Sequence, residues 1–125
     1  MAQIRWHKRA LWELDEKLEY AREMFGSATV KRWIKELRET EKRLSMMPEA
    51  FTPEPLLKDC RRTYRMCQLM NRRFKLIYTY CQSSDTVSIV DIWDSRMNPD
   101  TLKKRVPEKL CQISEVFVLM PKTEI

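Results

Sequence analysis

Basic side chains gather in one short stretch of the sequence, and their chemistry suits a partner that carries phosphate groups. Residues 57–75 hold seven lysines and arginines against one acid, whereas residues 1–56 and 76–125 are nearly balanced, at +1 and −1. This stretch therefore accounts for the whole formal charge of +6. A field of one sign attracts polyanions, so we expect nucleic-acid binding here, and the alternative is a solvated charged face. The residues expected to bind are Lys58, Arg61, Arg62, Arg72 and Arg73.

The residue counts exclude several other kinds of site. A single glycine, Gly26, rules out both a Walker loop and a dinucleotide-binding fingerprint, because each needs several glycines. A single histidine, His7, leaves no imidazole pair for zinc and is expected as a surface residue at a helix start. We therefore expect no cofactor and no metal, with a cysteine-held structural metal as the alternative. The cysteines, none of them in a C-x-x-C pair, are expected as reduced thiols: Cys60, Cys67, Cys81 and Cys111.

Length and composition point to one folded domain in the cytoplasm. At 125 residues, with 43% hydrophobic and 34% charged side chains, the chain suits a single soluble domain. Its longest apolar run, Val116–Met120, is far shorter than the ~20 residues of a membrane-spanning helix. The first residues are basic and lack the apolar segment of a secretory signal, so we expect no membrane contact. The residues do not fix an oligomeric state.

The first half of the chain has the periodicity of a strand followed by two helices. Alternation around Ile4 and Trp6 predicts a short strand. Apolar residues then recur at helical spacing over 10–25 and again over 30–47, with Pro48 ending the second helix. Gly26 is expected as a left-handed C-cap and Ser27 as the next N-cap, which predicts an antiparallel helix hairpin.

The second half predicts an antiparallel sheet after an irregular, proline-containing connector at 48–60. Three β-rich segments, at 63–70, 73–82 and 86–93, predict a three-stranded meander. One face should pack on the helices and the other stay open, with Arg65 and Lys75 together on that open face. The expected class is α+β in a single domain over 1–125, with a core at 1–99 and a C-terminal extension of uncertain structure at 100–125. The side chains expected to face the core from the second strand are Phe74, Leu76, Tyr78 and Tyr80.

The order of these elements resembles the RelE/ParE superfamily of bacterial type II toxins over about residues 2–102. The resemblance implies a small toxin held inactive by an acidic or amphipathic cognate antitoxin, with roles in growth inhibition and plasmid stabilization. RelE-like members cut messenger RNA on the ribosome, whereas ParE-like members share the fold but poison DNA gyrase. The motifs that carry the resemblance are Ile4-Arg5-Trp6, Tyr64-Arg65, Arg73-Phe74-Lys75-Leu76-Ile77-Tyr78 and Ile89-Val90-Asp91-Ile92-Trp93-Asp94-Ser95-Arg96-Met97-Asn98-Pro99.

The resemblance also implies catalytic positions, because Arg65, Lys75 and Arg96 match three basic positions of RelE-like nucleases. In that chemistry Lys75 would be the general base, since neighbouring positive charges favour a neutral amine, and the arginines would hold phosphate oxygens. Two features depart from the pattern: Cys67 stands at a further basic position, and neither tyrosine nor histidine follows Tyr80. Three hypotheses stay open: a ribosome-dependent mRNA endonuclease, a ParE-like toxin of gyrase, and an inactive basic binding module.

Overall fold

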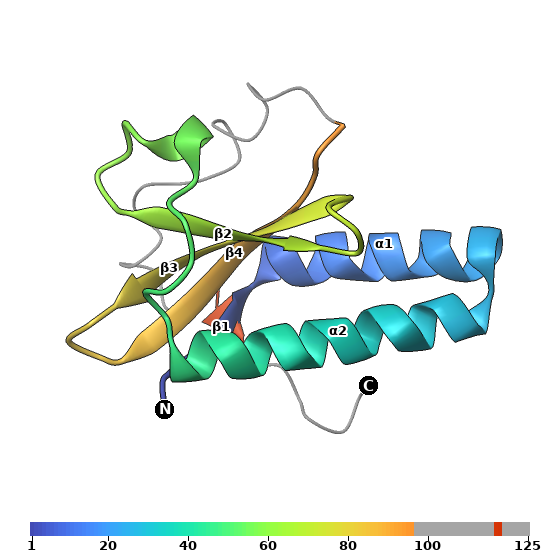
Figure 1. Ribbon diagram of the computed structural model, residues 1–125, viewed down its shortest axis with the longest axis horizontal. Helices are drawn as coiled ribbons and strands as arrows, with labels where there is room; N and C mark the ends of the chain where they lie inside the picture. Colours follow the sequence, from blue (N-terminus) through green and yellow to red (C-terminus); the bar gives the residue numbers. More distant parts are fainter. Residues whose placement is uncertain (97–116, 119–125) are drawn as a thin grey trace.

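The computed structural model describes residues 1–96 and 117–118, and its elements follow the predicted order (Figure 1). A short strand, a helix pair and a three-stranded meander confirm the α+β class. Apart from one two-residue strand, the expected extension at 100–125 lies outside the described residues. The elements are β1 (Gln3–His7), α1 (Lys8–Phe25), α2 (Ser27–Met46), the 3-10 turn η1 (Pro55–Leu57), β2 (Tyr64–Leu69), β3 (Phe74–Cys81), β4 (Thr86–Asp94) and β5 (Phe117–Val118).

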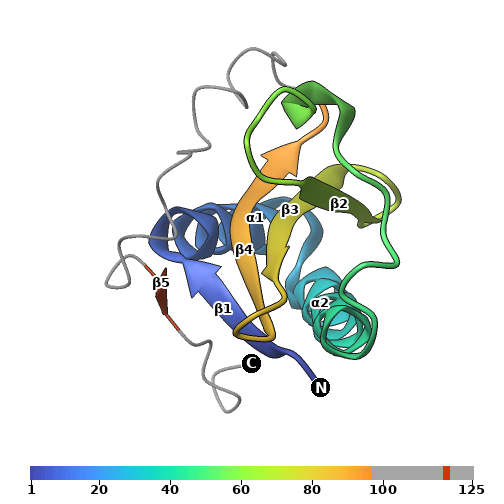
Figure 2. The same ribbon diagram turned by 90° about the vertical axis from the view of Figure 1, so that its left-hand side faces the viewer.

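The strands form one mixed sheet in the order β2-β3-β4-β1-β5. The meander β2-β3-β4 is antiparallel as predicted, and its strand bounds lie within one residue of the expected ones. β1 runs parallel to β4, and β5 pairs antiparallel with β1. The helix hairpin covers one face of this sheet, and the end-on view shows β1 beside β4 (Figure 2).

The helix hairpin turns at a single residue, Gly26, whose φ of 90° suits the residue without a side chain. Gly26 ends α1 and also precedes α2, so Ser27 is already the first helical residue. The prediction of Ser27 as an N-cap is therefore wrong, because so short a connection leaves no separate capping position. At the other end of α1, His7 is the N-cap, and its Nδ1 accepts from the Arg9 amide at 3.1 Å.

Each helix buries one stripe against the sheet, as its periodicity predicts. The buried residues of α1 are Ala10, Leu14 and Ala21, and those of α2 include Val30, Leu37 and Leu44. Ala10, Leu14, Leu37 and Leu44 share one cluster with Phe74, Leu76 and Tyr78 of β3. This confirms these three β3 residues as core-facing, whereas Tyr80 is half-buried at the edge of the same cluster. Among the described residues, no helix is both long and apolar enough to cross a bilayer.

The face of the sheet away from the helices is covered rather than open. A second apolar cluster lies there, with Tyr64, Ile77, Val90 and Trp93 of the sheet packed on Leu57 of η1. The segment between α2 and β2, here called the connector (residues 47–63), passes over this face (Figure 1). The expectation of an open face is wrong because β3 and β4 carry large apolar side chains on both faces, and these need cover from water.

The connector is also hydrogen-bonded along the edge of β2. The Glu54 amide donates to the Tyr64 carbonyl at 2.7 Å, and the Met66 amide donates to the Thr52 carbonyl at 2.9 Å. These bonds satisfy backbone groups on an edge strand that would otherwise face solvent. The connector is therefore an ordered part of the sheet, not the irregular link that its prolines suggest.

Candidate functional site

β2 and β3 place Arg65 and Lys75 on opposite faces of the sheet. Arg65 stands opposite Tyr78 in the register, and paired residues share a face, so Arg65 lies on the helix side. Lys75 stands opposite Gln68 and Trp93, on the side covered by the connector. The prediction that Arg65 and Lys75 share a face is wrong. Arg65 shares the face of its partner Tyr78, whereas Lys75 is three positions from Tyr78 along β3, and an odd separation along a strand places two side chains on opposite faces.

Arg65 holds the connector in place. Its Nη1 donates to the Phe51 carbonyl oxygen at 2.7 Å, and its backbone forms an isolated bridge with Pro53. The Tyr78 hydroxyl, on the same face, donates to the Pro48 carbonyl at 2.6 Å, and the Phe51 ring meets the Tyr78 ring edge-on. Within the described residues, the Arg65 guanidinium therefore donates a hydrogen bond to a backbone carbonyl near the start of the connector.

Lys75 forms an ion pair with a buried carboxylate of the connector. Its Nζ lies 3.2 Å from each carboxylate oxygen of Glu54, and the two side chains are 20% and 0% exposed. Glu54 also accepts from the Leu56 amide at 3.3 Å, as the N-cap of η1. A general base must approach the proton that it removes, whereas the Lys75 amine is held beside this buried carboxylate.

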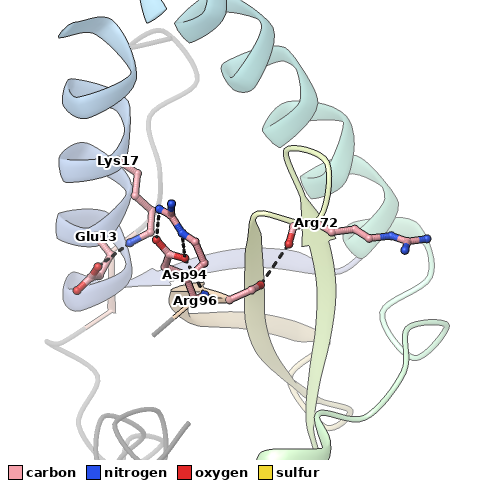
Figure 3. Close-up of polar contacts among 6 residues, drawn as sticks. Glu13, Lys17, Arg72, Asp94 and Arg96 are labelled. Carbon is pink, nitrogen blue, oxygen red and sulfur yellow. Dashed lines mark hydrogen bonds and ion pairs between the residues drawn. The ribbon is translucent and has the colours of Figure 1, made fainter. Parts of the chain in front are cut away.

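Arg96 follows β4 and folds back onto Asp94 (Figure 3). Its Nη2 and Nε lie 3.0 and 3.2 Å from the two carboxylate oxygens, and its backbone amide also donates to Oδ1 at 2.9 Å. These bonds hold the pKa of Asp94 below its usual range. The Arg96 side chain is 69% exposed, and the Lys17–Glu13 ion pair of α1 lies beside it (Figure 3).

The five residues expected to bind nucleic acid are spread over three places. Lys58, Arg61 and Arg62 lie on the connector, where the first two are exposed and Arg62 is half-buried beside a cavity. Arg72 is exposed on the β2–β3 turn, and its side chain points away from Arg96 (Figure 3). Nucleic-acid binding by these residues stays a prediction.

Arg73 differs from the other four because it stacks on the helix hairpin. Its guanidinium lies over the rings of Tyr20, Phe25 and Phe74 at 5.6, 5.6 and 5.7 Å from their centroids. Such contacts are worth about 0.5–2 kcal/mol each and tie the β2–β3 turn to α1. The basic stretch at 57–75 is therefore divided between the connector, the turn and both faces of the sheet.

Two carboxylates bind these basic residues and were not predicted from the sequence: Glu54, which pairs with Lys75, and Asp94, which pairs with Arg96. Glu54 had a usable signal, because an acid directly before Pro55 is typical of a residue that caps a turn with proline at its first position. Asp94 lies two residues before Arg96, a spacing too common to be informative. No pattern in the sequence pairs Glu54 with Lys75, since 21 residues separate them.

A comparison with protein families matches residues 4–99 to the family described as "ParE toxin of type II toxin-antitoxin system, parDE". The match begins within β1 and continues past the end of β4, so it includes the helix hairpin, the connector and the meander. No curated protein matches the chain. The fold that the resemblance to the RelE/ParE superfamily implies is the fold observed. The match covers well over half of the sequence, and the chain therefore belongs to the ParE toxin family of type II toxin–antitoxin systems.

Proposed function

We propose that this toxin arrests growth by binding DNA gyrase and that it does not cleave RNA. Membership of the family implies a cognate antitoxin as its partner. The choice between the two activities of the superfamily depends on whether the basic residues could act together on a phosphodiester. Cleavage by a 2′-hydroxyl needs a base for its proton, donors for the charge on phosphorus and an acid for the leaving oxygen.

The ion pair between Lys75 and Glu54 is the observation that carries the proposal. Lys75 is the side chain of the three that could lose a proton, because arginine stays charged at any physiological pH. A carboxylate with no exposed surface lies 3.2 Å from its amine and holds the amine on the connector. Releasing Lys75 would leave that carboxylate buried and uncompensated, which is strongly unfavourable.

The positions of the two arginines support the same choice. Arg65 is separated from Lys75 by the sheet and is bonded to the Phe51 carbonyl, so it is not placed to hold a phosphate beside that amine. Arg96 is engaged by both carboxylate oxygens of Asp94. Residues 81–125 contain neither the tyrosine nor the histidine that the resemblance to RelE-like nucleases would place there.

The proposal is tested by inducing the chain in a bacterial host without its antitoxin. Growth, RNA 5′ ends and the DNA-damage response are followed in the same culture. We expect arrest with intact messenger RNA and an induced damage response. New 5′ ends clustered within translated codons would contradict the proposal and favour the ribonuclease. Harmless expression of folded protein would favour an inactive binding module instead.

A matched variant separates the structural role of Lys75 from a catalytic one. Lys75→Arg keeps a cation for the Glu54 carboxylate but cannot act as a base. We expect this variant to remain fully toxic. Lost toxicity in a variant that melts like the parent protein would show that the amine takes part in chemistry, against the proposal.

A further inference from the structure

We propose that the outward face of α2 binds the phosphate backbone of duplex DNA through a row of exposed lysines. This row, here called the lysine row, consists of Lys31, Lys35 and Lys42. The choice of DNA among polyanions rests on the proposed action on gyrase, an enzyme that works on a DNA duplex. The lysine row lies outside the basic stretch at 57–75, where nucleic-acid binding was expected from the sequence.

Helical geometry places the three lysines on one side of α2. An α-helix turns by about 100° per residue, so positions 31, 35 and 42 point within about 40° of one another. The stripe that α2 buries against the sheet, which includes Leu37 and Leu44, lies on another side of the helix. The lysine row therefore runs along the solvent side of α2 over about 16 Å.

The fold makes this side of α2 basic by turning two of its acids inward. Residues 31–43 contain six basic side chains and three acids. The Glu36 carboxylate accepts from the Met70 amide at 2.8 Å, and the Glu41 carboxylate accepts from the Trp6 indole at 3.2 Å, so both acids are half-buried. The exposed residues of this segment are then five bases and one acid: Lys31, Arg32, Lys35, Glu39, Lys42 and Arg43.

The lysines are available to a ligand, whereas the two exposed arginines already have partners. Arg32 donates through Nη2 to the Thr29 hydroxyl at 3.0 Å, and the Arg43 guanidinium lies over the Phe51 ring at 5.9 Å from its centroid. The ammonium groups of the lysine row form no hydrogen bond or ion pair within the part of the chain that the structure describes. A phosphate can therefore bind them without breaking a contact of the described residues.

The composition of this surface favours a nucleic acid over a polypeptide. Every exposed side chain over residues 31–43 is charged, so the surface offers no exposed aromatic or aliphatic anchor there. Protein partners are usually held by such anchors, whereas nucleic-acid interfaces are polar and strongly positive. Duplex DNA carries one charge per about 1.7 Å of its axis, so a duplex lying along α2 brings several phosphates within reach of the lysine row.

The neighbouring helix limits where a duplex can lie. α1 and α2 lie side by side on one face of the sheet (Figure 2). Over residues 15–23 of α1, four exposed acids stand against one exposed base, Arg22, which pairs with Glu19 at 3.0 Å. This segment repels phosphates, so we expect the duplex along α2 and away from α1. The exposed acids are Asp15, Glu16, Glu19 and Glu23.

The test measures the anisotropy of a short labelled DNA duplex with the purified toxin between about 50 and 200 mM salt. Three phosphate contacts predict a fall in affinity of about 40-fold over this range. Lys35→Gln and Lys42→Gln should each weaken binding several-fold at the lower salt and reduce the slope of log affinity against log salt by about 1. Lys8→Gln, the matched control, removes the same charge from the first turn of α1 and should leave both quantities unchanged.

Three results would overturn the assignment. The first is a salt slope that neither lysine variant changes, although both melt like the parent protein. The second is an equal loss of affinity in Lys8→Gln. The third is displacement of the duplex by polyglutamate as readily as by unlabelled DNA, which would make this face a surface for an acidic polypeptide.

A supercoiling assay with the same proteins separates this proposal from the action on gyrase. Binding of the duplex that depends on Lys35 and Lys42, in a toxin that leaves gyrase fully active, would contradict the action on gyrase and support the lysine row. Inhibition of gyrase by a toxin whose lysine variants bind the duplex like the parent protein would support that action and overturn the lysine row.

Discussion

Replacing Glu54 with glutamine tests whether the connector is fastened over the sheet by the ion pair with Lys75. The substitution keeps the shape of the side chain and one acceptor oxygen, but it removes the charge. The Lys75 ammonium, 20% exposed, would then face a neutral amide at the positions now held by two carboxylate oxygens. Breaking a fully buried pair in this way costs about 3–5 kcal/mol.

The partial exposure of Lys75 sets the magnitude at the lower end of that range. Water can still reach part of the ammonium, so we expect a loss of about 3 kcal/mol in the free energy of unfolding. For a chain of this length the loss corresponds to a fall of about 10 °C in melting temperature. Lys75→Met combined with Glu54→Leu replaces both charges with apolar groups and should recover most of the lost stability.

The assay is urea unfolding followed by circular dichroism, with Glu49→Gln as the matched control. Glu49 is an exposed connector residue whose carboxylate accepts from the Gln82 side-chain amide at 3.4 Å, so its loss should cost under about 0.5 kcal/mol. Equal midpoints for Glu54→Gln and Glu49→Gln would refute the reasoning that the buried pair fastens the connector.

Three further predictions concern single side chains. His7→Ala removes the N-cap of α1 and should lower the free energy of unfolding by about 1 kcal/mol, whereas His7→Asn should keep it; equal urea midpoints for the two variants would contradict this. Because burial lowers the pKa of His7, the contribution of the cap is present above pH 6.5 and is lost as the pH falls below it. Burial raises the pKa of Glu41, which accepts from the Trp6 indole, so its contribution is present below pH 4.5 and is lost as the pH rises through the folded value. Glu41→Gln should therefore gain stability relative to the parent protein between pH 4 and pH 7, and a constant difference across that range would count against burial as the cause. Alkylation of Cys81 should reach half its maximal rate near pH 7, and Ser83→Ala should move this midpoint upward; an unmoved midpoint would show that the Ser83 hydrogen bond is not the cause.

The order of elements could be predicted because the patterns are local. Apolar stripes of helical period and the single glycine predict the helix hairpin, and β-rich segments separated by turns predict the meander. Both predictions lie within a few residues of the observed bounds. The parallel pairing of β1 with β4 could not be predicted this way, since it joins residues more than 80 positions apart. The covered outer face had a signal in Ile77, Val90 and Trp93, because each is an apolar residue directly after a core-facing apolar residue of the same strand.

The strand positions of Arg65 and Lys75 could be predicted, but the arrangement of their side chains could not. The sequence showed Arg65 and Lys75 on neighbouring strands, but their relative facing depends on the register, which the turn between the strands sets. Their partners, the Phe51 carbonyl and the Glu54 carboxylate, come from a connector whose path the sequence did not reveal.

The most direct test of the central claim is a pair of reactions with the purified toxin. One measures DNA supercoiling by gyrase, and the other measures cleavage of messenger RNA on translating ribosomes. We expect the toxin to inhibit supercoiling, its antitoxin to reverse the inhibition, and the messenger RNA to stay intact. Cleaved messenger RNA with fully active gyrase would contradict this expectation.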